Sequence, residues 1–218
     1  MTARRPIVLW LVVLAASISV AGCAVTDTTR YYALGQVGTG KVDAVRNPPG
    51  PANPSTARGS QGETGTAAIG VGPVFVPGYL DRIQIVTRTG ADQVDLSPFY
   101  RWAEPLDDGI ARVLAEEIGA RVPTDRIVMF PWRGVVAQAL QYQVVVAVTR
   151  FDGPPGGNIT LDTRWRILGR DGNELAFRRS TMIESAGGTG YEPMIAAMHR
   201  ALVTLGQEIA AEIQAMPR

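Results

Sequence analysis

The sequence contains few of the residues from which covalent and metal chemistry is usually built. Among its 218 residues there is one cysteine, one histidine and one lysine. A single cysteine cannot form a disulfide within the chain, and one histidine beside it leaves only carboxylates as further metal ligands. A hydrolytic triad needs a nucleophile and an orienting carboxylate around its histidine, and no pattern in the sequence supplies such partners for His199. We therefore expect no metal and no catalytic residues.

The chain also lacks an excess of charge of either sign. Its 21 basic side chains stand against 20 acidic ones, and loss of Arg4 and Arg5 with an N-terminal signal leaves 19 basic residues. Domains that bind nucleic acid normally carry a clear basic surplus. We therefore expect no nucleic-acid partner.

One long apolar run lies near the N-terminus, at residues 7–22, directly after Pro6 and two arginines. Its 16 residues fall short of the roughly 20 that a membrane-spanning helix needs, which argues against a transmembrane anchor. Residues 20–23 read VAGC, with an aliphatic and two small residues before the only cysteine. This order is typical of a bacterial lipobox, in which the signal is cut before the cysteine and the thiol is acylated. An ordinary signal peptide with a cysteine nearby is the alternative.

We therefore predict that residues 1–22 are a cleaved signal peptide and that Cys23 is the lipid attachment site. The mature protein would carry a diacylglycerol and an N-acyl chain such as palmitate on Cys23, and no other cofactor. Ala24 stands where an aspartate would signal retention in the inner membrane. The expected location is the outer membrane, with the protein lipid-anchored and facing the periplasm.

Composition divides the mature chain into three parts. Residues 23–35 form a polar tether that ends in a short strand, because two tyrosines, an alanine and a leucine follow one another there. Residues 36–67 are rich in glycine, proline, serine and threonine without apolar periodicity, and are predicted to be a flexible linker. Residues 68–218 are patterned as one folded periplasmic domain, long enough to bury a core of its own.

About seven strands are predicted in this domain. Apolar and polar residues alternate most regularly at 159–167, which predicts a strand with one buried face. The pair Asp171-Gly172 then predicts a tight turn into the next strand. Earlier in the domain, Pro98 is expected to end a strand at 93–97, because proline cannot donate to a strand ladder.

Two amphipathic helices complete the prediction. The first begins near Pro105 and ends near Val122. The second carries a stripe of apolar residues at steps of three and four, between Ile195 and Ile213. Both helices must cover a sheet, so the sequence predicts an α+β fold: a mixed, largely antiparallel sheet with two helices packed on it.

A glycine-rich loop at 187–190 precedes the second helix. A loop that enters a helix can hold an anion on its backbone N–H groups, and a phospholipid headgroup is a natural guest. Such loops more often only turn the chain. Gly188 and Gly190 are therefore kept as possible contacts with a partner or lipid.

Several segments form a recognisable ordered set: the lipobox, residues 31–34, 71–74, 77–82, 101–106 and 149–153, the strand around Trp165, and residues 190–191. Taken together in this order, they resemble the PqiC-like outer-membrane lipoproteins, also described as auxiliary lipoproteins of ABC-type transport. The resemblance covers nearly all of residues 23–214. Relative to the usual pattern of the family, the linker at 36–67 is longer.

This resemblance implies a non-enzymatic part in the traffic of lipids or hydrophobic solutes between two membranes, and so in membrane integrity. It also implies an MCE-domain protein of the inner membrane and periplasm as the partner, which the lipoprotein would dock at the outer membrane. The alternative is an envelope assembly or scaffold lipoprotein with no direct role in lipid movement. A homo-oligomer that matches a tubular partner is a further expectation.

Two aromatic residues inside the matching segments are candidates for the docking surface. Tyr79 and Trp102 could anchor a partner, since aromatic side chains often dominate interfaces. They could equally be core residues that close the corner between sheet and helix. The sequence leaves both readings open.

Overall fold

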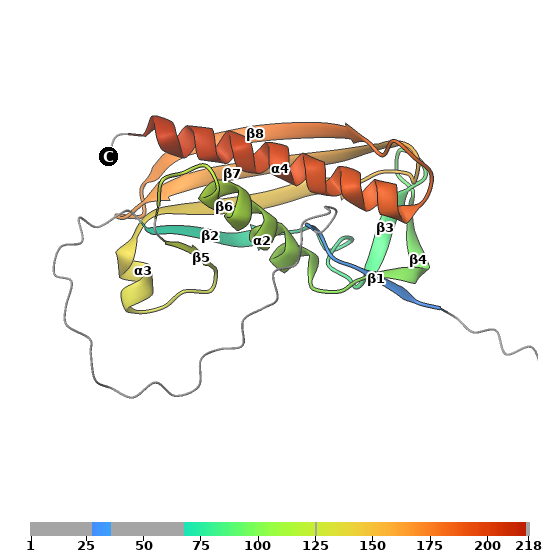
Figure 1. Cartoon of the computed structure of the whole chain (residues 1–218), viewed down its shortest axis with the longest axis horizontal. Coiled ribbons are helices and arrows are strands. Elements are labelled where there is room, and N and C mark those ends of the chain that lie inside the picture. Colours follow the sequence, from blue (N-terminus) through green and yellow to red (C-terminus); the bar gives the residue numbers. More distant parts are fainter. Residues whose placement is uncertain (1–27, 36–67, 125, 217–218) are drawn as a thin grey trace, which may run out of the picture.

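The computed structural model describes residues 28–35, 68–124 and 126–216. The predictions for the signal peptide, for Cys23 and for the linker at 36–67 lie outside these residues. Within the described ranges the protein has two sheets, and its two longer helices lie side by side over one face of the larger sheet (Figure 1). No helix in those ranges is long and apolar enough to cross a membrane.

The large sheet has five strands in the order β5-β2-β6-β7-β8. They are β2 (Ala68–Phe75), β5 (Ile127–Met129), β6 (Leu140–Asp152), β7 (Asn158–Gly169) and β8 (Glu174–Ser185). The three long strands β6, β7 and β8 pair antiparallel, whereas β2 runs parallel to both of its neighbours. Mixed pairing of this kind follows from the chain order, because neighbouring long strands are joined by short turns and β2 is joined to β6 by a long crossover.

The turn between β7 and β8 was predicted from Asp171-Gly172 and is confirmed. Gly172 has a φ of 79°, a conformation that side chains with a Cβ rarely adopt. Its N–H donates to the Gly169 carbonyl, and the Asp171 carboxylate accepts from the Asn173 N–H. The turn therefore fixes the register in which β7 and β8 bury alternate residues.

The small sheet has three strands in the order β1-β4-β3. They are β1 (Arg30–Tyr32), β3 (Gln84–Arg88) and β4 (Val94–Trp102). Strand β1 is the short N-terminal strand expected within residues 23–35, and it pairs parallel to the end of β4. Leu34, just after β1, is 1% exposed, so this segment is packed into the body of the protein.

The prediction that Pro98 ends its strand is wrong. Strand β4 runs through Pro98, but its pairing with β3 is irregular there, since Leu96 faces Val86 and the next pair is Arg101 with Gln84. The Tyr100 N–H donates to the Ser97 hydroxyl instead of to β3. Proline is tolerated inside a strand where a bulge already removes the ladder hydrogen bond.

Helices α2 (Leu106–Gly119) and α4 (Tyr191–Ala215) are the two predicted amphipathic helices. Helix α2 lies on β2 and β5, helix α4 lies on β7 and β8, and the two helices contact each other (Figure 1). Every residue of the predicted stripe in α4 is buried: Ile195, Met198, Leu202, Leu205, Ile209 and Ile213. A third, short helix, α3 (Val135–Ala139), was not predicted, and none of its residues is buried.

The core lies between these helices and the large sheet. Trp165 of β7, which is 1% exposed, is the largest fully buried side chain of the described residues, and its indole N–H donates to the Ser180 hydroxyl on β8. Full burial of one large apolar side chain contributes roughly 1.5–3 kcal/mol. The predicted α+β class is confirmed, with eight strands in the described residues, divided between two sheets instead of about seven in one.

Candidate functional site

A buried carboxylate joins the two sheets. Asp152, at the end of β6, has no exposed surface, and Arg88 of β3 donates to both of its oxygens, at 2.8 Å from Nε and 3.0 Å from Nη2. Arg150 donates to Oδ1 at 2.9 Å, and the Tyr79 hydroxyl donates to Oδ2 at 2.9 Å. We call these four residues the Asp152 cluster.

The electrostatics of the Asp152 cluster favour the charged carboxylate. Burial by itself would raise the pKa of Asp152, but the hydrogen bonds from Arg88, Arg150 and Tyr79 outweigh it and hold the pKa below the usual range. Burial, followed by the hydrogen bond to Asp152, raises the pKa of Tyr79 to about 12. Tyr79 therefore stays a neutral donor and Asp152 stays an anion across the physiological range.

The geometry of the Asp152 cluster fits a structural role. Its carboxylate oxygens are taken up by hydrogen bonds from within the chain, and the Arg88 backbone N–H also donates to the Gly153 carbonyl at 3.2 Å. The described residues include no group of three or more carboxylates or histidines that could hold a metal. What the cluster does is attach β3, and with it the small sheet, to the end of β6.

Three tyrosines gather where β1, β4 and α4 meet. The rings of Tyr100 and Tyr191 stack with their centroids 4.0 Å apart, and Tyr32 lies 6.0 Å from Tyr100 in a tilted arrangement. Stacked aromatic pairs contribute about 0.5–1.5 kcal/mol beyond the area that they bury. The stack holds the N-terminal strand against the start of α4.

A cleft of about 570 Å³ opens beside this stack. It lies between β1 and the first turns of α4, and we call it the aromatic cleft; its lining residues are Tyr31, Tyr32, Ala33, Glu192, Pro193, Ile195 and Ala196. Glu192 is the one charged side chain in this set, and its carboxylate lies 4.0 Å from Arg30 at the surface. Tyr31 is 61% exposed at the rim. A volume and lining of this kind suit an apolar group.

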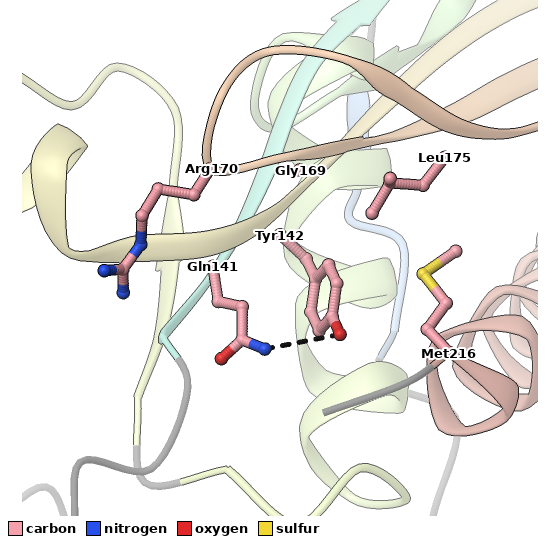
Figure 2. A pocket seen from close by; sticks show the side chains of 6 residues that line it. All are labelled: Gln141, Tyr142, Gly169, Arg170, Leu175 and Met216. Carbon is pink, nitrogen blue, oxygen red and sulfur yellow. Dashed lines mark hydrogen bonds between the residues drawn. The ribbon is translucent and has the colours of Figure 1, made fainter.

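A second cavity of similar volume lies at the other end of β8 (Figure 2). Tyr142, Leu175 and Met216 face one another across it, whereas the Arg170 side chain extends away from them. Gln141 donates to the Tyr142 hydroxyl at 3.3 Å. The cavity borders the C-terminal end of α4, far along β8 from the glycine-rich loop, and it contains no candidate nucleophile paired with a base.

The predicted contact residues fall in different surroundings. Trp102 is 6% exposed and belongs to the core, and Tyr79 is half-buried in the Asp152 cluster. Both positions favour packing over docking for these two side chains. Gly190, with a φ of 100°, is exposed immediately before α4, and Gly188 is partly exposed in the same loop. His199 is partly buried on α4, off the apolar stripe.

Sequence reasoning missed Asp152 as the centre of a charged cluster. Its partners Tyr79 and Arg88 are 73 and 64 residues away in the chain, so no local spacing brings them together. One usable signal was present, because Asp152 follows a strongly apolar strand and stands two residues after an arginine. A carboxylate at such a position is buried with partners more often than it is left alone.

The comparisons with known proteins agree with this fold. A search of curated proteins found no match. An uncharacterised protein of known crystal structure is 20% identical with a TM-score of 0.60, over 85% of this chain and 99% of that one. Protein XCC0632 from Xanthomonas campestris, of family DUF330, is 18% identical with a TM-score of 0.58, over 84% of this chain and 93% of that one. At these identities the likeness establishes the fold.

Family membership comes from the sequence itself. The family described as "ABC-type transport auxiliary lipoprotein component" matches residues 50–210, which is most of the chain. This match confirms the resemblance found in the ordered motifs, and it places the protein with transport-associated lipoproteins and not in an enzyme class. The chain belongs to the ABC-type transport auxiliary lipoprotein family.

Proposed function

We propose that this protein is the outer-membrane lipoprotein subunit of an MCE-type system that moves lipids or hydrophobic solutes between two membranes. In this role it docks the periplasmic MCE component at the outer membrane. The observation that carries the proposal is the family match over residues 50–210, whose description joins a lipoprotein to ABC-type transport. The lipobox at 20–23 supports the same reading.

The N-terminal strand supports a domain held close to its membrane. Six residues separate Cys23 from Arg30, where β1 begins. A chain extends by at most about 3.6 Å per residue, so this stretch reaches about 25 Å. Acyl chains contribute about 0.8 kcal/mol per buried methylene, and more than one chain is needed for a stable anchor. An acylated Cys23 would therefore keep the domain near the bilayer surface.

The glycine-rich loop is our proposed contact with the MCE partner. Gly188 and Gly190 lie at the same end of the molecule as the aromatic cleft, because Tyr191 begins α4 and stacks on Tyr100. A loop without bulky side chains lets a partner backbone approach closely. Tyr79 and Trp102 support this end of the protein from within.

Photocrosslinking in the native membrane tests the proposal. A photoreactive residue replaces the exposed Thr189, between the two glycines, and a matched one replaces the exposed Glu174 at the other end of β8. We expect Thr189 to capture an MCE-domain protein and Glu174 to capture it far less. If the probe at position 189 captures a porin or a peptidoglycan-bound protein and no MCE protein, the docking proposal is wrong and the scaffold role is favoured.

The lipid anchor needs its own test. Cys23→Ser removes the thiol that is acylated, so the variant should lose its acyl chains and leave the membrane fraction. Mass spectrometry of the mature N-terminus and membrane fractionation measure the two effects. Retention of Cys23→Ser in the outer membrane would show that another feature anchors the protein.

A further inference from the structure

The large sheet has one face that no helix of the described chain covers over β7 and β8. Alternate residues of β8 point to α4: Ser180 donates to Glu208 and Arg178 donates to Glu212. The intervening residues point the other way and are exposed. We call this surface the open face; its exposed residues are Arg164 and Arg166 of β7 and Phe177, Arg179, Thr181 and Ile183 of β8.

Three arginines are concentrated on the open face. Arg164 and Arg179 are direct partners across the two strands, and Arg166 lies next along β7, opposite Phe177. Like charges placed directly opposite one another destabilise a strand pair. The side chains of such a pair stand only about 5 Å apart at their Cβ atoms.

These arginines have no counter-ion within the described part of the chain. None of the salt bridges found there includes Arg164, Arg166 or Arg179. An acidic side chain on this face, Asp162, accepts from the Thr181 hydroxyl at 2.6 Å. Arg178, the sequence neighbour of Arg179 on the opposite face, is paired with Glu212 at 2.7 Å.

The difference between Arg178 and Arg179 indicates that the open face binds an anion from outside the protein. On the covered face Arg178 is paired with Glu212 and Glu184 with Arg200, both from α4, whereas the three guanidinium groups of the open face have no salt bridge among the described residues. A guanidinium binds phosphate oxygens through two parallel hydrogen bonds, which suits it to phosphate-bearing surfaces. An external anion would relieve the repulsion between Arg164 and Arg179.

The apolar residues among the arginines indicate which anion. Phe177 is 49% exposed and Ile183 is 62% exposed on the same face. Cationic groups interspersed with apolar side chains are typical of surfaces that lie at the boundary between phospholipid headgroups and acyl chains. The short stretch between Cys23 and β1 also keeps Arg30 within about 25 Å of the bilayer in which an acylated Cys23 would be anchored.

We propose that the open face docks on anionic phospholipid headgroups, with Arg164, Arg166 and Arg179 binding phosphates and Phe177 reaching the headgroup boundary. This inference rests on the lipid attachment proposed above, because the anchor supplies the nearby membrane. The anchor fixes where the protein is, and the open face fixes which side of it lies against the bilayer. The MCE partner would then meet the protein in one orientation.

The test uses the mature acylated chain reconstituted in vesicles. After acylation of Cys23 an introduced Ile183→Cys carries the only free thiol, and Gln207→Cys on the exposed side of α4 is its matched control. A fluorophore on each cysteine reports contact with a quencher attached to lipid headgroups. Vesicles contain phosphatidylcholine alone or a mixture with phosphatidylglycerol.

We expect stronger quenching at position 183 than at position 207, and only on the anionic vesicles. Each arginine near an anionic surface changes the docked population about fivefold. The triple variant R164Q/R166Q/R179Q should therefore lose the quenching, and Arg179→Gln alone should weaken it about fivefold, whereas Arg178→Gln should not. Raised salt should act like the triple variant.

Two outcomes would overturn the inference, and both differ from failure of the anchor. Quenching at position 183 that is the same on neutral and anionic vesicles would show that the open face does not select anionic headgroups. Loss of position 183 quenching only when an acidic protein is added would assign the open face to a protein partner. Failure of the anchor would appear instead as protein that leaves the vesicles altogether. Single variants keep the test valid if the triple variant does not fold.

Discussion

The two sheets of this protein are held by different forces. The large sheet is covered by α2 and α4 and stabilised by apolar packing around Trp165. The small sheet is attached through the Asp152 cluster and the tyrosine stack, with fewer buried side chains of its own. Apolar packing depends weakly on pH and salt, whereas a buried ion pair depends on the charge of its members. The two regions should therefore fail under different conditions.

The largest expected effect is on the large sheet, which apolar packing stabilises. Trp165→Ala removes the largest fully buried side chain of the described residues and leaves the Ser180 hydroxyl without its indole donor. We expect the free energy of unfolding to fall by about 3–5 kcal/mol. Chemical denaturation measures it, and the loss should be nearly the same at neutral and mildly acidic pH. A loss that depends strongly on pH would contradict the assignment of this region to apolar packing.

Removal of Asp152 should destabilise the attachment of the small sheet. Asp152→Ala leaves the partly buried Arg88 and Arg150 without their shared counter-ion, at a cost of about 3 kcal/mol. Amide exchange should accelerate in β3 and β4 more than in β7. Arg178→Ala, which removes an exposed ion pair with Glu212, is the control and should cost less than about 1 kcal/mol. Equal acceleration in both sheets would mean that they unfold as one unit.

Lowering the pH should destabilise the small sheet before the large sheet, without any mutation. The folded-state pKa of Asp152 is lowered, so its contribution is complete above its unfolded pKa of about 3.9 and is lost as pH falls through the folded value. Below about pH 4 the small sheet should lose protection in amide exchange before the large sheet does. In Asp152→Asn this step should be absent. A small sheet that keeps its protection to lower pH than the large one would reverse the comparison.

Tyr79→Phe should give the smallest effect. It removes one hydrogen bond to Asp152 and leaves both arginines in place, so we expect a loss of about 1 kcal/mol. Because the folded pKa of Tyr79 is raised to about 12, the contribution is complete below its unfolded pKa near 10 and is lost as pH rises from there. When tyrosine ionisation is followed by absorbance as the pH is raised, the wild-type protein should show a tyrosine that ionises near pH 12, and the variant should lack it.

The parts that the sequence predicted are those with local periodicity. The stripe of α4, the alternation of β7 and the turn at Gly172 each depend on residues near one another in the chain. The division into two sheets was not predictable, because the parallel pairing of β1 with β4 joins residues 70 positions apart. Continuation of β4 through Pro98 depends equally on a bulge against β3 that only the tertiary structure supplies.

The candidate sites show the same limit. The YYAL segment and the loop before α4 were noticed separately, and the structure brings them together through the stack of Tyr100 on Tyr191. The alternation that marks β7 as half-buried also places Arg164 and Arg166 on its outer face. It does not reveal that Arg179 lies opposite, since that requires the register of β8.

The parallel pairing of β1 with β4 has a mechanical consequence. A force that pulls on the N-terminus enters the folded protein at Arg30 and passes first into β4 through three paired residues. From there it crosses to the large sheet through Arg88 and Asp152, while Arg112 holds the carbonyl of Leu34 to α2. The small sheet thus forms one of two connections between the pulled end and the core, and the contact of Leu34 with α2 forms the other. Under load the small sheet should yield first, and the large sheet should keep its shape.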